Sequence, residues 1–205
     1  MIIHLIAAGK YQDQKNWPEI WSRCYSTLQS LPYQIKIWND EEIDNLIKQD
    51  DQDFCNVLNT LPLIYKWDYV RYIMMRDYGG AYIDMDVEII NNFIPLLNPN
   101  KLYLMEGTSG CYIENSIMVN INSQPYFWDD LKNFIKNKIY LNIKKSKDPK
   151  NVISITGAMA MSEFIVKEEM QRYGIQLEIL SRYHFASLTN EICFTRHYNT
   201  TSWLN

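Results

Sequence analysis

Two aspartates separated by one residue, Asp84 and Asp86, are the side chains of this sequence best suited to metal chemistry. They follow apolar residues at alternate positions, which predicts a β-strand, and residues two apart on a strand point to the same side. Two carboxylates presented together can hold a hard cation against the oxygens of a diphosphate. The pattern therefore predicts a site for a divalent cation and a phosphorylated ligand.

The same spacing occurs a second time, at Asp51 and Asp53. With 13 aspartates in 205 residues, about one such pair is expected by chance, so the spacing alone means little. The second copy lies in a polar run that no hydrophobic strand precedes. We therefore expect it in a solvated loop.

A helix is expected directly before the first pair, over residues 63–78. Gly79 and Gly80 can adopt left-handed backbone conformations and so end it. Within this helix Asp68 and Arg71 stand at i and i+3 and share one face. An acid and a base placed there could hold the hydroxyls of a ribose or a hexose. The simpler alternative is an exposed ion pair that contributes less than ~1 kcal/mol to stability.

The run from this helix to the second aspartate resembles a known family. The matching residues are Lys66-Trp67-Asp68-Tyr69-Val70-Arg71-Tyr72 and Tyr78-Gly79-Gly80-Ala81-Tyr82-Ile83-Asp84-Met85-Asp86-Val87. The run is similar to the glycosyltransferases with a DXD sugar-binding region, which include yeast-type α-mannosyltransferases and are distantly similar to glucosylating bacterial toxins. Weaker similarities are found at Ile2-Ile3-His4, Tyr33 to Asn39, Thr156-Gly157, His197 and Ser202-Trp203. Ala158 stands where the family has proline.

The resemblance implies a single glycosyltransferase domain over residues 1–205. Its fold would be α/β and GT-A-like, with a central mixed, mostly parallel sheet flanked by helices. The implied reaction is transfer of a hexose from a nucleotide sugar with retention at the anomeric carbon. Mn²⁺ or Mg²⁺ is the implied cofactor.

Carried onto this sequence, the resemblance gives most of the matching polar residues a role. The metal ligands would be Asp86, with Asp84 beside it, and His197. The donor sugar would be held by Asp68 and Arg71, which together with Asp84 form the expected catalytic set.

The nucleotide part of the donor has its own implied contacts. Tyr82 would line the nucleotide pocket, with Ser202 and Trp203 at the end of the sequence, where the indole N–H could donate to the β-phosphate. Among donors we expect UDP-sugars first and GDP-mannose second. The acceptor, a glycan, a protein or a small molecule, cannot be read from the sequence.

Strand and helix patterns alternate along the chain, which is typical of an α/β fold. Strands are expected over 1–8, 33–37, 81–89, 102–105, 116–119, 176–180 and 192–197. Helices are expected over about 18–30, 63–78, 126–139 and 159–173, with a further short helix opened by a capping box at Asn39 and Glu42. His4, on the first strand, is interpreted as a hydrogen-bonded core residue and not as a ligand.

The composition of the chain argues against some classes of protein and some cellular locations. A net charge of −4 gives no basic field for nucleic acid. The apolar N-terminus is too short for a membrane span, and the four cysteines show neither zinc-ligand spacing nor a dense disulfide framework. These features predict a soluble, cytoplasmic protein with reduced thiols.

Two other functions stay open at this level. A phosphohydrolase of the haloacid-dehalogenase type also ends a strand in Asp-x-Asp, but Glu88 stands where its signature has Thr or Val. A protein that binds sugar nucleotides without catalysis would carry the same motif. A glycoside hydrolase is disfavoured, because its two carboxylates must face a sugar from roughly 5–9.5 Å apart and not form a chelating pair.

Overall fold

The computed structural model describes residues 1–107, 110, 112–122, 124–167, 173–174, 176–186 and 193–200. Its strands are β1 (Ile2–Ile6), β2 (Gln34–Trp38), β3 (Gly80–Ile83), β4 (Val87–Ile89), β5 (Lys101–Glu106), β6 (Ile113–Asn120), β7 (Gln176–Leu180) and β8 (Thr195–His197). Its α-helices are α1 (Glu19–Gln29), α2 (Asp40–Asp50), α3 (Gln52–Leu58), α4 (Leu63–Asp77), α5 (Pro125–Leu141), α6 (Val152–Ile155), α7 (Ala158–Lys167) and α8 (Arg182–Phe185). Short 3₁₀ turns lie at Gly9–Tyr11, Gln14–Asn16, Ile94–Leu96, Lys145–Lys147 and Pro149–Asn151.

Six of the strands form one mixed sheet in the order β2-β1-β3-β6-β5-β7. The pairs β1–β2, β1–β3 and β5–β7 are parallel, whereas β3–β6 and β5–β6 are antiparallel. Parallel pairs predominate, so the expected α/β fold with a mixed, mostly parallel sheet is confirmed. Strands β4 and β8 form a separate antiparallel pair.

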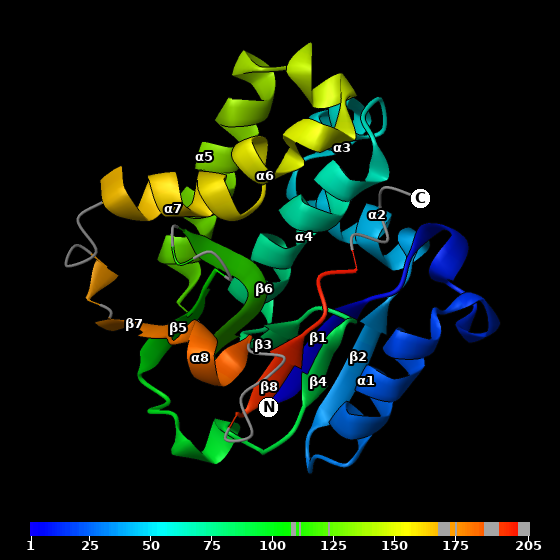
Figure 1. The fold of residues 1–205 in the computed structure, drawn as a ribbon. Helices are drawn as coiled ribbons and strands as arrows, with labels where there is room; N and C mark the ends of the chain where they lie inside the picture. Colours follow the sequence, from blue (N-terminus) through cyan, green and yellow to red (C-terminus); the bar gives the residue numbers. More distant parts are fainter. Residues whose placement is uncertain are drawn as a thin grey trace.

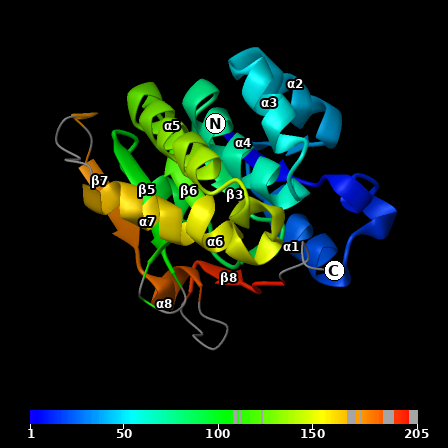
Figure 2. The ribbon, with the colours of Figure 1, turned by 90° about the horizontal axis from the view of Figure 1, so that it is seen from above.

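Helices cover both faces of the main sheet, so the sheet has a core on each side (Figures 1 and 2). On one face, α2 to α7 pack around strand residues such as Tyr82 and Met118. On the other face, α1, β4 and α8 pack around their sequence neighbours Ala81 and Val119. Successive residues of a strand point to opposite faces, which is why each central strand is apolar along its length.

The single strand expected over 81–89 is wrong, because the chain turns between β3 and β4. The turn is closed by the N–H of Val87, which donates to the carbonyl oxygen of Asp84 at 3.1 Å. Beyond it, β4 leaves the main sheet and pairs with β8, with Val87 opposite His197. The apolar residues still alternate across the break, because those of β3 and those of β4 are buried in the same core. An alternating apolar pattern indicates which residues are buried, but it does not indicate which strand is the hydrogen-bonding partner.

The helix before the turn ends as the two glycines predict. Gly79 and Gly80 have φ angles of 61° and 81°, in the left-handed region. A Cβ on Gly80 would lie 2.3 Å from the carbonyl oxygen of Ile2, so only glycine allows β3 to come this close to β1. Helix α4 itself is buried on several sides, and its polar residues Lys66 and Asp68 are buried with it.

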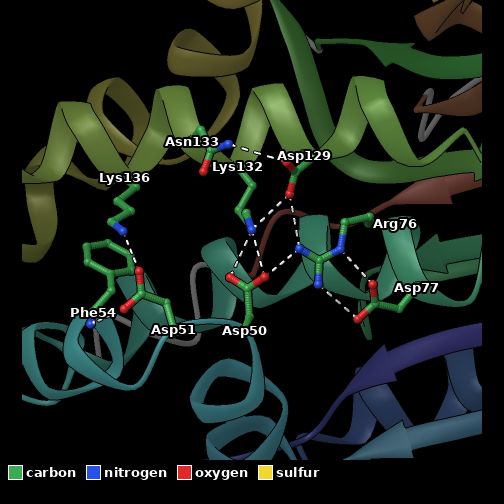
Figure 3. A network of polar contacts seen from close by, with 9 residues as sticks. All are labelled: Asp50, Asp51, Phe54, Arg76, Asp77, Asp129, Lys132, Asn133 and Lys136. Atoms are coloured by element: carbon green, nitrogen blue, oxygen red, sulfur yellow. Dashed lines mark hydrogen bonds and ion pairs between the residues drawn. The ribbon is translucent and has the colours of Figure 1, made fainter.

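The acidic run around Asp51 is not the solvated loop that we expected, because it joins α2 to α3. Asp51 caps α3 by accepting a 2.8 Å hydrogen bond from the N–H of Phe54. Asp50 lies beside it with its side chain 7% exposed and accepts from Lys132 of α5 at 2.7 Å and from Arg76 of α4 (Figure 3). Only the side chain of Asp50 is buried, by charges on α4 and α5 that lie far away in the sequence, so local polarity could not predict it.

Two further predicted elements are only partly described. Helix α7 is described as far as Lys167, and residues 168–172 of the helix expected over 159–173 lie outside the described residues. Strand β8 occupies the end of the segment expected over 192–197. Among the described residues, no helix combines the length and the apolar character that crossing a membrane requires.

Candidate active site

A cavity of about 210 Å³ lies where the ends of β1 and β3 meet α4, the start of β6 and the segment after β8. In α/β proteins ligands commonly bind at the carboxyl ends of sheet strands. Part of the cavity lining is polar and is contributed by Asp68, Arg71, Asp84, Asp86, Glu114, Asn115 and His197. Another part is apolar, contributed by Ile64, Trp67, Val152, Ile153 and Ala158.

Arg71 joins the α4 residues to the first aspartate of the DXD pair. Its Nη2 lies 3.2 Å from Oδ1 of Asp68 and 3.4 Å from Oδ1 of Asp84. Its guanidinium carbon lies 4.8 Å from the centre of the Tyr82 ring, and its Nη1 donates to the carbonyl oxygen of Asn115 at 3.2 Å. The exposed helix ion pair considered above is excluded, since Arg71 is 7% exposed and Asp68 4%.

Asp68 is held by donors from three parts of the chain. Besides Arg71, the side-chain amide of Asn115 donates to it at 3.2 Å and the hydroxyl of Thr156 at 2.9 Å. Burial raises the pKa of Asp68, and these partners oppose the increase. Gly157 follows Thr156 and approaches closely, because a Cβ there would lie 3.3 Å from Oδ2 of Asp68. The weak Thr-Gly similarity thus falls on a turn that contacts the predicted sugar-binding acid.

Asp86 is held by the segment that follows β8. Its Oδ2 accepts from the backbone N–H of Thr200 at 2.7 Å and from the Thr200 hydroxyl at 2.9 Å. Its Oδ1 lies 3.3 Å from Nε2 of His197. The chain reaches this position through Asn199, whose φ of 49° is left-handed. The pairing of β4 with β8 therefore brings the end of the described chain onto the second aspartate.

The predicted metal ligands come together and suit a divalent cation. One ligand atom from each of Asp84, Asp86 and His197 can be chosen so that all lie within 4.8 Å of one another. Carboxylate oxygens suit Mg²⁺ and Mn²⁺, and an imidazole nitrogen suits first-row transition metals. The mixed set of donors therefore fits Mn²⁺ better than Mg²⁺.

Without a cation, the charges of these groups are strongly coupled. Burial raises the pKa of Asp84 to about 6, with Arg71 opposing the increase and Asp86 adding to it. Burial also acts to raise the pKa of Asp86, but hydrogen bonds from His197 and Thr200 outweigh it and hold the pKa at about 2. For His197 burial acts to lower the pKa, and hydrogen bonds to Asp86 and Glu114 raise it to about 10. Without a cation, the His197 ring is therefore held in its protonated form, and a cation that binds Nε2 has to replace the proton there.

The sequence around this site matches a described protein family. Residues 15–103 match "Glycosyltransferase sugar-binding region containing DXD motif", and Asp68, Arg71, Tyr82 and the DXD pair all fall inside the match. Residues 15–103 are a glycosyltransferase sugar-binding region. The chain is 30% identical over 123 residues to "Mannosyl phosphorylinositol ceramide synthase CSH1" of Saccharomyces cerevisiae, which covers 57% of this chain and 32% of the yeast protein. It is 25% identical over 128 residues to "Inositol phosphoceramide mannosyltransferase 1" of Schizosaccharomyces pombe, covering 60% of this chain and 40% of that protein.

The chain thus spans between about a third and two fifths of the length of these curated relatives. A longer match, at 22% identity, is to "Uncharacterized glycosyltransferase L373" of Acanthamoeba polyphaga mimivirus, and it covers 99% of this chain and 84% of the viral protein. Among solved structures, "PaToxG Glycosyltransferase" aligns with a TM-score of 0.54 at 18% identity over 84% of this chain and 72% of that one. The glycosyltransferase domain of the YGT toxin aligns with a TM-score of 0.51 at 13% identity, over 82% of this chain and 56% of that one. The fold is therefore that of glycosyltransferases.

The sugar-binding region supplies only part of the cavity. Glu114, Asn115 and Thr200 line the cavity from later parts of the chain, and no sequence motif predicted them. They belong to no local motif, and the only signal for Glu114 is a charged residue two positions before the strand expected over 116–119. Ser202 and Trp203, which were expected to contact the nucleotide, lie outside the described residues.

Proposed function

We propose that this chain transfers a hexose from a nucleotide sugar to an acceptor hydroxyl in a reaction that depends on a divalent cation. The observation that carries the proposal is the convergence of Asp84, Asp86 and His197 within 4.8 Å in one cavity. This cavity also contains the DXD pair of the sugar-binding region. The length and register of the match support a glycosyltransferase over a phosphohydrolase.

The proposed metal ligands are Asp86 and His197, with Asp84 facing the metal or the ribose of the donor. When bound, a divalent cation supplies the positive charge that stabilises the negative charge developing on the leaving diphosphate. The protein prepares for this charge by fixing Asp86 through Thr200 and Asp84 through Tyr82. Ligands held in this way need little reorganisation when the cation and the diphosphate bind.

The donor sugar is proposed to lie against Asp68 and Arg71. Asp68 is an acceptor for hydroxyl groups, and Arg71 is a donor to hydroxyl or phosphate oxygens. Nε of Arg71 is buried and has no hydrogen-bond partner among the described residues, so a ligand oxygen in the cavity could satisfy it. The apolar part of the lining, including Trp67, would exclude water from the reacting atoms.

We also propose that transfer proceeds with retention, as the resemblance implies. Each of the four carboxylates that line the cavity among the described residues, Asp68, Asp84, Asp86 and Glu114, already contacts a protein donor. This arrangement supports attack by the acceptor on the same face as the departing diphosphate, without a covalent sugar intermediate. The anomeric configuration of the product, read by proton NMR, tests retention directly.

The donor base and the acceptor are the least constrained parts of the proposal. The names of the yeast relatives support testing mannosyl donors and acceptors that contain an inositol phosphate. UDP-sugars, the first expectation from the sequence, are to be tested beside GDP-mannose.

A thermal-shift screen of UDP, GDP and their sugars, with and without Mn²⁺, tests the proposal. A ligand present at 100 times its Kd adds ~2.7 kcal/mol of stability, which for a chain of this size corresponds to an increase in Tm of roughly 5–10 °C. We expect at least one nucleotide to produce such an increase only when Mn²⁺ is present. Release of free sugar or transfer to an acceptor in the same conditions then establishes catalysis.

Two variants make this screen decisive. Asp86→Ala removes a proposed metal ligand and should abolish the Mn²⁺-dependent increase. Asp53→Ala alters the other Asp-x-Asp at a residue that is exposed on α3, and should respond as the wild type does. The proposal is overturned if no nucleotide stabilises the wild type in a metal-dependent way, or if Asp86→Ala responds identically.

A further inference from the structure

Glu114 is a buried carboxylate beside the proposed metal site that belongs to no recognised motif. It stands near the start of β6, lines the cavity and is 7% exposed. A carboxylate buried to this extent is costly unless donors satisfy it. Its partners should therefore reveal why a charged residue occupies this position.

One partner of Glu114 is the imidazole ring of His197. Oε2 of Glu114 lies 3.2 Å from Nδ1 of His197, and the hydroxyl of Ser116 donates to the same oxygen at 3.2 Å. The other ring nitrogen, Nε2, lies 3.3 Å from Oδ1 of Asp86. The imidazole is thus held between two carboxylates that come from different parts of the fold.

The two carboxylates constrain the ring differently. Backbone pairing of β8 with β4 fixes the position of the His197 backbone, but it does not fix the orientation of the imidazole ring. Glu114 belongs to the main sheet, whereas Asp86 belongs to the turn that leads into β4. An ionised carboxylate only accepts hydrogen bonds, so each contact needs a proton on the ring nitrogen that makes it. A cation bound by Nε2 would replace the proton on that nitrogen and leave the proton that Nδ1 donates to Glu114.

We propose that Glu114 is a positioning residue: it fixes the tautomer and the orientation of His197 so that Nε2 faces the cation shared with Asp84 and Asp86. A histidine that binds a metal commonly donates its second ring N–H to a carboxylate, which also makes the ligating nitrogen more basic. Glu114 itself does not touch the cation in this arrangement. The inference rests on the proposed function, because it gives Glu114 a role only if His197 binds metal.

Titration with Mn²⁺ alone, followed by electron paramagnetic resonance of the free ion, measures the effect on affinity. Glu114→Leu removes the acceptor and should raise the Kd for Mn²⁺ by roughly 10–100-fold. Glu114→Gln keeps an oxygen that can accept from Nδ1 and should cost less. Glu178→Gln makes the same change on β7, at an exposed pair with Lys101, and should leave the Kd unchanged.

A double-mutant cycle separates positioning from a direct or a general structural effect. In a His197→Ala background, Glu114→Gln and Glu114→Leu should cause no further loss of Mn²⁺ affinity, because the residue through which Glu114 acts is absent. If the loss is as large in that background as in the wild type, the positioning role is overturned.

Histidine NMR of the metal-free protein gives a second readout, the hydrogen-bonded proton on Nδ1 of His197. The signal of this proton should be shifted downfield and slow to exchange with solvent in the wild type, where Glu114 accepts it, and should lose both properties in Glu114→Leu. An unchanged Nδ1–H signal in that variant contradicts the inference even if metal affinity falls. A wild-type chain that binds no Mn²⁺ instead overturns the metal role in the proposed function, and this inference with it.

Discussion

The hydroxyl of Tyr82 donates a 2.7 Å hydrogen bond to Oδ1 of Asp84. The two residues are the last but one of β3 and the first of the turn that follows it. The same carboxylate oxygen lies 3.4 Å from Arg71, whose guanidinium rests on the Tyr82 ring. Tyr82 therefore orients the first aspartate of the DXD pair through its hydroxyl and the neighbouring arginine through its ring.

Removing the Tyr82 hydroxyl should weaken the site more than the fold. Tyr82→Phe keeps the ring under Arg71 and loses one hydrogen bond to a charged group, which is worth about 1.5–3 kcal/mol. We expect kcat/KM in Mn²⁺ to fall by roughly tenfold, about 1.4 kcal/mol. Steady-state kinetics over a range of Mn²⁺ concentrations measure this change.

Tyr69→Phe is the matched control, because it also removes a buried hydroxyl from an aromatic ring. The Tyr69 hydroxyl has no hydrogen-bond partner among the described residues and does not line the cavity. Its loss should leave kcat/KM unchanged and leave the Tm equal or higher. Equal losses of activity in the two variants would mean that the Tyr82 contact has no particular part in the site.

How far the sequence predicts the site depends on how local each signal is. The run from Lys66 to Val87 predicts α4, the glycine turn and the cluster of Arg71 with Asp84, since all its parts are neighbours along the chain. Residues such as Glu114 and Thr200 reach the same cavity through pairing of distant strands. Strand pairing depends on burial over the whole chain, so no short sequence pattern predicts it. The break between β3 and β4 was missed for the same reason.

The buried charges between α2, α4 and α5 give a prediction about stability (Figure 3). Asp50→Ala leaves Lys132 buried, with its side chain 8% exposed, and removes a partner of Arg76. We expect a loss of about 3 kcal/mol in the free energy of unfolding, the lower end of the range for a broken buried pair, because Asp129 still contacts Lys132.

Urea denaturation of Asp50→Ala and Asp53→Ala checks this difference. Asp53 is three residues away and exposed in the first turn of α3, so its loss should cost less than ~1 kcal/mol through the helix dipole alone. Similar costs for the two variants would show that the network in Figure 3 contributes no more than surface charges do.

The left-handed backbone at Asn199 predicts a preference for glycine over alanine. Both Asn199→Ala and Asn199→Gly remove the amide, but only alanine strains the backbone at a φ of 49°. Asn199→Ala should lose about 1 kcal/mol, or roughly 2–4 °C in Tm. It should also weaken Mn²⁺ binding, because Thr200 would no longer reach Asp86 in the same geometry. Equal values for the two variants would show that this backbone conformation is not needed at the site.

His4 is a buried histidine whose hydrogen bonds permit only its neutral form. The indole N–H of Trp38 can only donate, and it lies 3.2 Å from Nδ1 of His4, so that nitrogen must be unprotonated. Nε2 then carries the proton and donates to the carbonyl oxygen of Gly79 at 3.1 Å. Burial lowers the pKa of His4 to about 4, although the bond to Gly79 acts in the opposite direction. The sequence-based interpretation of His4 as a hydrogen-bonded core residue is confirmed.

This pKa predicts how stability changes with acid. The unfolded chain protonates His4 near pH 6.5, whereas the folded chain does so only near pH 4. The contribution of His4 is therefore complete above pH 6.5 and is lost as the pH falls to 4, at about 1.36 kcal/mol per pH unit. His4→Gln cannot titrate, so the stability advantage of the wild type over this variant should shrink by on the order of 3 kcal/mol across that window. Urea denaturation at intervals between pH 7 and pH 4 measures the difference, and ¹⁵N NMR of the ring should show neutral His4 at pH 5.5. A constant difference across the window, or a protonated ring at pH 5.5, would rule out this role for the Trp38 contact.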